Sequence, residues 1–161
     1  MTTTGTAEVT LPTDEQILIT REFDAPPELV YEAWTTPELV QQWWGDRRGS
    51  GMTAEIDLTV GGSWRYAMEA NGGFEVAFHG TYSEIVPNER LVNTEIFEGA
   101  PDAVSEITTT FTALDGDRTR TEQLCVYPSR EVRDMVLESG MEAGMQESMD
   151  ALERVAVGLK S

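Results

Sequence analysis

The sequence predicts an α+β fold with an antiparallel sheet of about six or seven strands, two short helices after the first strand and a long C-terminal helix. Between residues 52 and 127, short segments of alternating apolar and polar residues are separated by tight turns, as in an antiparallel meander. After Pro128 the apolar spacing changes to that of an amphipathic helix. The change of period divides the chain into a strand-rich body and a helical end.

The first strand is expected at residues 16–24, where two sets of side chains alternate along the chain. One set is Ile17, Ile19, Arg21 and Phe23. Pro26 and Pro27 end this strand, and Pro27 suits the first position of a helix because its missing N–H needs no partner there. A second helix is expected directly afterwards, with Thr36 as its N-cap, Pro37 as its first residue and Gly45 at its end.

The remaining strands are predicted from alternation and from the turns between them. They are residues 52–58, 63–70, 74–86, 90–97, 104–114 and 118–127. The turns at 71–73 and 115–117 contain glycine, which favours hairpins. Strands joined by such short turns form an antiparallel sheet.

The C-terminal helix follows Ser129, a candidate N-cap. Its apolar face is expected to contain Met141, Met145, Met149, Leu152, Val155 and Leu159. Gly140 and Gly144 weaken the first part of the helix, so a kink or break is expected near them.

Composition limits the class of protein. We expect the 161 residues to form a polar N-terminal tail, residues 1–14, and a single domain, residues 15–161. A net charge of −18 argues against binding to nucleic acid or to anionic membranes. No apolar segment is long enough for membrane insertion and no signal peptide is apparent, so we expect a cytoplasmic protein. With only one cysteine, Cys125, and one histidine, His79, we expect no disulfide, no metal site and no cofactor.

Several short stretches, taken in order, resemble a known family. They include Arg21, Phe23, Ala25, Pro26, Val30, Ala33, Pro37, Trp43 and Trp44, then residues 61–65, Gly80, residues 84–87 and 89–92, and finally Gly144, Met145 and Leu152. The pattern resembles the START-like (SRPBCC) superfamily, with the helix-grip fold of the birch-pollen allergen, in its branch of proteins similar to activators of the heat-shock-protein-90 ATPase. It extends from about residue 15 to the end of the sequence. Two positions depart from it, because the family often has Trp where Tyr31 and Met145 stand.

The resemblance implies a sheet curved around the last helix, with an apolar cavity between them. Members of the superfamily mostly bind apolar small molecules, so it implies an apolar or amphipathic ligand, lipid-like or polyketide-like. Two alternatives stay open. One is an enzyme of the polyketide cyclase or hydrolase type, although no catalytic residue stands out in the sequence. The other is a protein-interaction module, acting as a chaperone partner or as a homodimer.

Aromatic residues and methionines provide most of the candidate ligand-binding side chains. The full set is Trp43, Trp44, Trp64, Tyr66, Met68, Phe78, Glu95, Phe97, Phe111, Met141, Met145 and Met149. For the apolar members, packing in the core is the alternative. Only one of the adjacent residues Trp43 and Trp44 is expected to point inward, because neighbouring side chains of a helix face different directions.

Glu95 is the one charged candidate. It shares a strand face with Leu91, Asn93 and Phe97. If that face points inward, the carboxyl group is buried, its pKa is raised, and it can act as a base or as the partner of a cation. For His79 and Cys125 we expect structural roles.

Overall fold

The computed structural model contains an eight-stranded antiparallel sheet whose strand order is β1-β2-β8-β7-β6-β5-β4-β3. The structure describes residues 7–44, 52–70, 74–139 and 141–160, without the side chains of Met52, Glu69, Ala70, Phe74 and Met141. The strands are β1 (Glu8–Thr10), β2 (Gln16–Phe23), β3 (Met52–Ile56), β4 (Ser63–Ala70), β5 (Phe74–Val86), β6 (Arg90–Phe97), β7 (Val104–Leu114) and β8 (Arg118–Val126). The helices are α1 (Pro27–Thr35), α2 (Pro37–Trp43), α3 (Arg130–Glu138) and α4 (Met141–Gly158).

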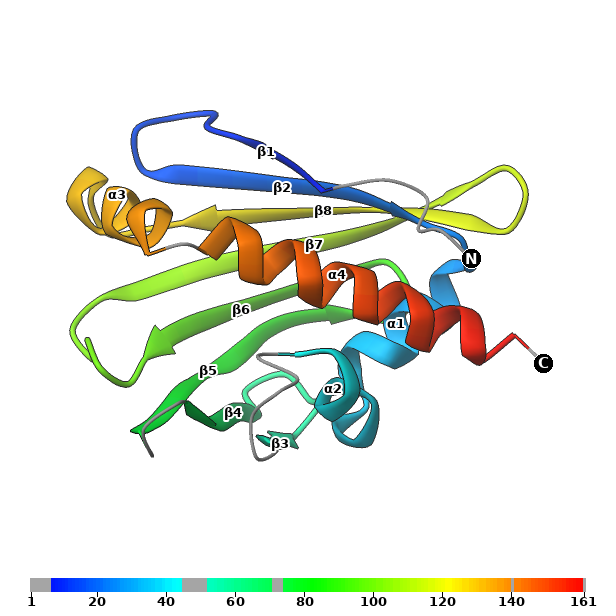
Figure 1. The fold of residues 1–161 in the computed structure, drawn as a ribbon, viewed down its shortest axis with the longest axis horizontal. Coiled ribbons are helices and arrows are strands. Elements are labelled where there is room, and N and C mark those ends of the chain that lie inside the picture. Colours follow the sequence, from blue (N-terminus) through cyan, green and yellow to red (C-terminus); the bar gives the residue numbers. More distant parts are fainter. Residues whose placement is uncertain (1–6, 45–51, 71–73, 140, 161) are drawn as a thin grey trace.

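The long helix α4 crosses one face of the curved sheet, as Figure 1 shows. The helices α1 and α2 lie near the C-terminal end of α4, while α3 lies at its N-terminal end (Figure 1). The backbone of α4 approaches α1 and α2 closely. This arrangement is the helix-grip fold that the order of segments predicted.

Strand registers decide which side chains face α4. On β2 the predicted alternation is confirmed, because Ile17, Ile19 and Phe23 are buried. On β6, Glu95 lies opposite Ser105 of β7, a buried residue. Residues directly opposite each other in an antiparallel pair lie on the same face. The face of β6 that contains Glu95 therefore points toward the helices.

Two apolar clusters form the core. The larger lies where α1, α2 and α4 meet the sheet, and it includes Phe23, Val30, Trp43, Phe111 and Leu152. The smaller lies at the other end, where Ile17, Ile19, Ile107, Cys125 and Tyr127 pack against α3. Met145 of α4 packs against both clusters. The helix therefore connects the two halves of the core.

A buried ion pair fastens α4 to β2. Arg21 is only 1% exposed, and its guanidinium lies 2.9 Å from Asp150 Oδ1 and 3.1 Å from Glu153 Oε1. The second oxygen of Glu153 accepts a hydrogen bond of 2.9 Å from the backbone N–H of Asp24. Arg21 also lies 5.2 Å from the centroid of the Phe23 ring. One charged cluster thus joins segments at opposite ends of the chain.

Three features differ from the sequence-based expectation. The strand β1 lies within the predicted tail and pairs with β2, and the backbone of Ala7 exchanges hydrogen bonds of 2.9 and 2.8 Å with the Gln146 side chain. Three residues are too few for a periodic signal, so this strand was missed. Thr36 occupies the N-cap position of α2 without a side-chain hydrogen bond, so the predicted hydroxyl cap is wrong. The strand predicted at residues 52–58 ends at Ile56.

The break expected near Gly140 is confirmed, because separate helices end at Glu138 and begin at Met141. Ser129 caps α3 as predicted, accepting a hydrogen bond of 3.2 Å from the N–H of Val132. The predicted turn at 71–73, and the residues Gly45 and Gly140 themselves, lie outside the described residues.

Candidate functional site

A half-buried patch occupies the inner face of β4, β5 and β6. We call it the inner patch, and it consists of Tyr66, Met68, Val76, Phe78, Asn93, Glu95 and Phe97. Most of its members are half-buried, and Phe97 is 42% exposed. On β2, β7 and β8, by contrast, the inner-face residues Ile17, Ile107, Phe111, Thr121 and Cys125 are buried. The two halves of the same sheet face are therefore covered to different degrees.

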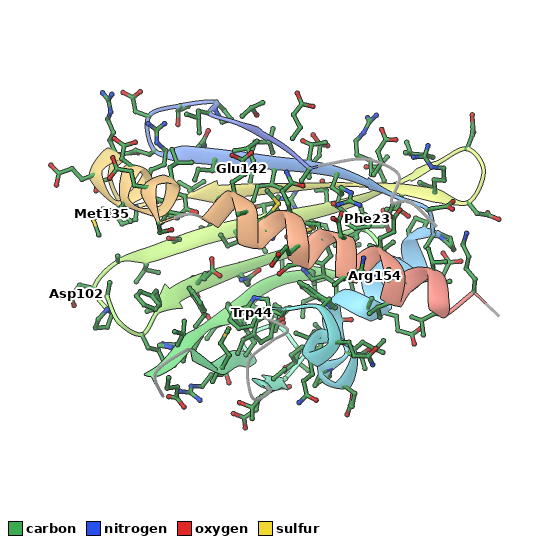
Figure 2. The ribbon with its side chains drawn as sticks, in the orientation of Figure 1. Phe23, Trp44, Asp102, Met135, Glu142 and Arg154 are labelled. Atoms are coloured by element: carbon green, nitrogen blue, oxygen red, sulfur yellow. The ribbon has the colours of Figure 1, made fainter. Side chains whose placement is uncertain are left out.

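Aromatic rings connect the inner patch to α2. The Trp44 ring lies 5.3 Å from that of Tyr66 and 5.6 Å from that of Phe78, both in edge-on geometry. Phe78 in turn lies 5.2 Å from Phe97, its direct partner on β6. Figure 2 shows Trp44 at the end of α2, beside the strands β4 and β5. These contacts form a continuous aromatic surface across three strands and one helix end.

Trp64 borders this surface and is fixed by a close approach of two strands. Its indole Nε1 donates a hydrogen bond of 3.2 Å to the backbone oxygen of Thr94, across Gly80 of the intervening strand. A Cβ at Gly80 would overlap the Thr94 carbonyl oxygen and lie 2.8 Å from Trp64 Nε1. Glycine is therefore required there, because it lets the indole reach the strand that contains Glu95. Asn93 Nδ2 donates to the same Thr94 oxygen over 3.0 Å.

Glu95 is the charged group of the inner patch. No hydrogen bond or ion pair within the described part of the chain involves its carboxyl group. Burial raises the pKa of Glu95 from an ordinary value of 4.5 to about 7, because the charged form loses contact with bulk water. The sequence-based hypothesis of an inward carboxyl with a raised pKa agrees with this geometry.

Three weakly acidic side chains lie within the electrostatic reach of Glu95. They are Tyr66 on β4, Cys125 on β8 and Tyr127, which directly follows β8. Burial raises the pKa of all three above their ordinary values, and the charge of Glu95 raises each of them further. For Cys125 the pKa reaches about 12, so the thiol stays protonated and inert, as expected from the sequence.

The structure separates the predicted ligand-binding residues into groups. Trp44, Tyr66, Met68, Phe78, Glu95 and Phe97 come together at the inner patch, with Trp64 beside it and Met145 half-buried on α4. Trp43, Phe111 and Met149 lie instead in the larger core cluster. The side chain of Met141 lies outside the described part of the structure.

The adjacent tryptophans illustrate the separation. Trp43 is 4% exposed, packs 5.7 Å from the ring of Trp34 and donates its N–H to the backbone oxygen of Ala33 over 2.8 Å. Trp44 turns toward the inner patch. The two rings face different directions, but both pack against the interior, so the expectation that only one of them points inward is wrong.

Two residues on the inner face, Val76 and Tyr127, were not singled out from the sequence. Val76 lies directly opposite Met68, and its place two residues before Phe78 puts it on the same strand face. Tyr127 lies two residues after Cys125, so the same alternation places the two side chains on one face. Neither could be chosen without knowing which face of each strand points inward.

His79 lies on the outer face of β5, away from the inner patch. Its Nδ1 is 2.9 Å from Glu98 Oε2, and Arg65 binds both oxygens of the same carboxylate at 2.9 and 3.0 Å. Hydrogen bonds from Arg65 lower the pKa of Glu98 to about 2. The only histidine thus belongs to a surface ion cluster, in agreement with a structural role.

Within the described ranges, no group of three or more His, Cys, Asp or Glu side chains is arranged to hold a metal ion. In the same ranges, each helix is too short or too polar to cross a membrane. What the inner patch offers chemically is a broad aromatic surface, one carboxyl group that titrates near neutral pH, and a neighbouring tyrosine.

Comparison with solved structures places the fold among bacterial proteins of similar length. A protein from Rhodobacter sphaeroides is 24% identical, with a TM-score of 0.86 over 96% of this chain and 100% of its own. A protein from Mycobacterium smegmatis is also 24% identical, with a TM-score of 0.82 over 94% of this chain and 96% of its own. A protein from Arthrobacter aurescens is 26% identical, with a TM-score of 0.81 over 96% of this chain and 93% of its own.

No curated protein matches the sequence. Residues 24–156 match the family described as activator of Hsp90 ATPase homolog 1-like protein. That match covers most of the chain and includes α1, α2, the strands β3 to β8 and nearly all of α4. The chain therefore belongs to the activator of Hsp90 ATPase homolog 1-like family, within the START-like superfamily.

Proposed function

We propose that this domain binds an apolar or amphipathic small molecule in a cavity between the inner patch and α4. The observation that carries the proposal is the uneven cover of the sheet. On β2, β7 and β8 the inner-face residues Ile17, Ile107, Phe111, Thr121 and Cys125 are buried, while the members of the inner patch on β4 to β6 stay half-buried or exposed although a helix crosses the same face. Partly accessible aromatic rings that face the interior are typical of small-molecule sites.

The expected affinity follows from the apolar area that a ligand would bury. Removing ~300 Å² of apolar ligand surface from water contributes ~7 kcal/mol before costs. Loss of translational and rotational freedom and ordering of side chains reduce this value. We therefore expect dissociation constants in the micromolar range or weaker for a ligand without polar anchors.

A fluorescence titration with the neutral apolar probe N-phenyl-1-naphthylamine tests this function. The native protein should bind the probe with a micromolar dissociation constant. Replacing Phe97 with aspartate should weaken binding about tenfold or more, because it puts a charge at the accessible edge of the inner patch. Val104 is the matched control, since it is also exposed but lies on the outer face, opposite Ile96.

Val104→Asp should change the affinity less than about twofold, because its side chain is already in water. Far-ultraviolet circular dichroism of both variants checks that they are folded. Absence of saturable binding to the native protein, or equal weakening by the two substitutions, would contradict the proposed site.

A general-base enzyme is the second candidate, and one observation favours it. Glu95, with a pKa of about 7, lies within electrostatic reach of the Tyr66 hydroxyl. A carboxylate with such a pKa is well suited to accept a proton from a bound substrate at neutral pH. If the domain is such an enzyme, its turnover rate should decrease as the pH is lowered below about 7, and turnover should be lost in Glu95→Gln. Simple binding predicts neither result.

A further inference from the structure

Glu95 is an acidic group on the inner side of the sheet, and it has no cationic partner among the residues that the structure describes. The buried charges of Arg21 and Glu153, by contrast, are paired with each other at 3.1 Å. No described residue donates a hydrogen bond to Glu95 or pairs with it. Buried charges in proteins are normally paired or hydrogen-bonded. Since the described residues supply no partner for Glu95, we look for that partner in a bound ligand.

Two hydrogen-bond donors of the inner face are used elsewhere. Trp64 has one N–H, and it donates to the backbone oxygen of Thr94. The Asn93 amide donates to the same oxygen. Arg65, which neighbours Trp64 and Tyr66 in sequence, lies on the outer face with Glu98. Glu95 as a residue is half-buried, so its side chain is not closed off from a ligand.

Aromatic rings surround the position of Glu95 on the sheet. Phe97 follows it by two residues on the same face, Phe78 lies opposite Phe97, and Tyr66 lies opposite Phe78. Trp64 reaches the strand of Glu95 through its bond to Thr94. Faces of aromatic rings attract cations, and a carboxylate among such rings is a typical environment for an ammonium group.

From this juxtaposition we infer that the ligand of the inner patch is a cationic amphiphile, in which a protonated amine binds Glu95 and an apolar body covers the aromatic rings. The inference rests on the proposed small-molecule binding and adds the chemical class of the ligand. The net charge of −18 also favours a cationic ligand, because it raises the concentration of cations near the protein.

The charge of Glu95 controls this interaction near neutral pH. Tyr66, Cys125 and Tyr127, the titratable groups that face Glu95 from β4 and from the end of β8, stay neutral because burial raises their pKa values. On α4, Glu142, Glu147 and Arg154 are exposed. A simple alkylamine stays protonated up to about pH 10. Between pH 6 and 8, therefore, Glu95 is the group that changes its charge at the patch.

The test compares two ligands with the same apolar body, 4-phenylbutylamine and 4-phenyl-1-butanol, by isothermal titration calorimetry of the full chain at pH 8. We expect the amine to bind at least about tenfold more tightly than the alcohol. Its affinity should fall about tenfold between pH 8 and pH 6, because Glu95 must then lose a proton before it can pair. The alcohol, which has no charge to pair, should show less than a twofold change.

Substitutions separate the effect of Glu95 from that of the overall charge. Glu95→Gln should reduce the ratio of amine to alcohol affinity to about one. The matched control is Glu106→Gln, an exposed residue of β7 that lies opposite Thr94 on the outer face. It removes the same charge and should leave the ratio as in the native protein.

The outcomes distinguish the two proposals. If the native protein binds neither ligand, the small-molecule function itself is wrong. If it binds both with equal affinity, that function stands and the preference for an amine is overturned. If Glu106→Gln lowers the ratio as much as Glu95→Gln does, the preference comes from net charge, and the assignment of Glu95 is overturned.

Discussion

Replacing Arg21 with methionine should lower the free energy of unfolding by about 3–5 kcal/mol, which is a large part of the stability of a typical domain. The guanidinium is buried and lies within 3.1 Å of carboxylate oxygens of Asp150 and Glu153. The substitution breaks the buried ion pair between Arg21 and Glu153, and the loss of one charged member of a buried pair is the source of the cost. Urea denaturation followed by circular dichroism measures the change.

Two comparisons make this result specific. The double variant Arg21→Met with Glu153→Gln should recover at least about 1 kcal/mol, because it also neutralises the second member of the buried pair and keeps an acceptor for the Asp24 N–H. Arg90→Met breaks an exposed ion pair with Glu84 and should cost less than about 1 kcal/mol. A loss for Arg21→Met no larger than that of Arg90→Met would show that the buried cluster does not fasten α4 to the sheet.

Glu95→Gln should make the protein more stable than the native form at pH 8, by up to about 3 kcal/mol. The pKa of Glu95 rises from 4.5 to about 7 on folding, so the folded state holds a proton more tightly than the unfolded chain does. The favourable contribution of this protonation is fully present below about pH 4.5 and is lost as the pH rises through about 7. Glutamine mimics the neutral carboxyl group at every pH.

The informative quantity is the difference in unfolding free energy between variant and native protein, measured from pH 5 to pH 8. The difference should be smallest at the acidic end, below about 1 kcal/mol, and should grow as the pH rises. Glu106→Gln, at an exposed position on the outer face of β7, should show no such trend. A difference for Glu95→Gln that stays constant with pH would mean that Glu95 is hydrated like a surface carboxylate.

Local patterns were sufficient to predict most of the fold. The alternation of Ile17, Ile19, Arg21 and Phe23 predicted the strand β2 with at least one buried face, and the change of period after Pro128 predicted the helical end of the chain. Turn residues gave the strand boundaries within one or two positions for most of the meander. The strand β1 could not be found in this way, because its order depends on pairing with β2 and on contacts to Gln146.

The candidate site was less predictable, since it depends on long-range partners. Alternation placed Glu95 on one of two faces, but only the pairing with Ser105 decides which face points inward. Nothing near Arg21 in the sequence indicates that Glu153 neutralises it, because that partner lies on another element. Among the methionines, Met149 fills the core while Met145 stays half-buried, a difference set by how α4 lies on the sheet.

The most direct test of the binding site is nuclear magnetic resonance of protein labelled with ¹³C at the methionine methyl groups, titrated with N-phenyl-1-naphthylamine. A ligand between the sheet and α4 should shift the methyl signals of Met68, in the inner patch, and Met145, on the helix. Met135 is 63% exposed and projects from α3, away from Trp44, so its signal should stay in place (Figure 2). Saturation with the probe that leaves Met68 and Met145 unchanged, or that shifts only Met135, would contradict a ligand site at the inner patch.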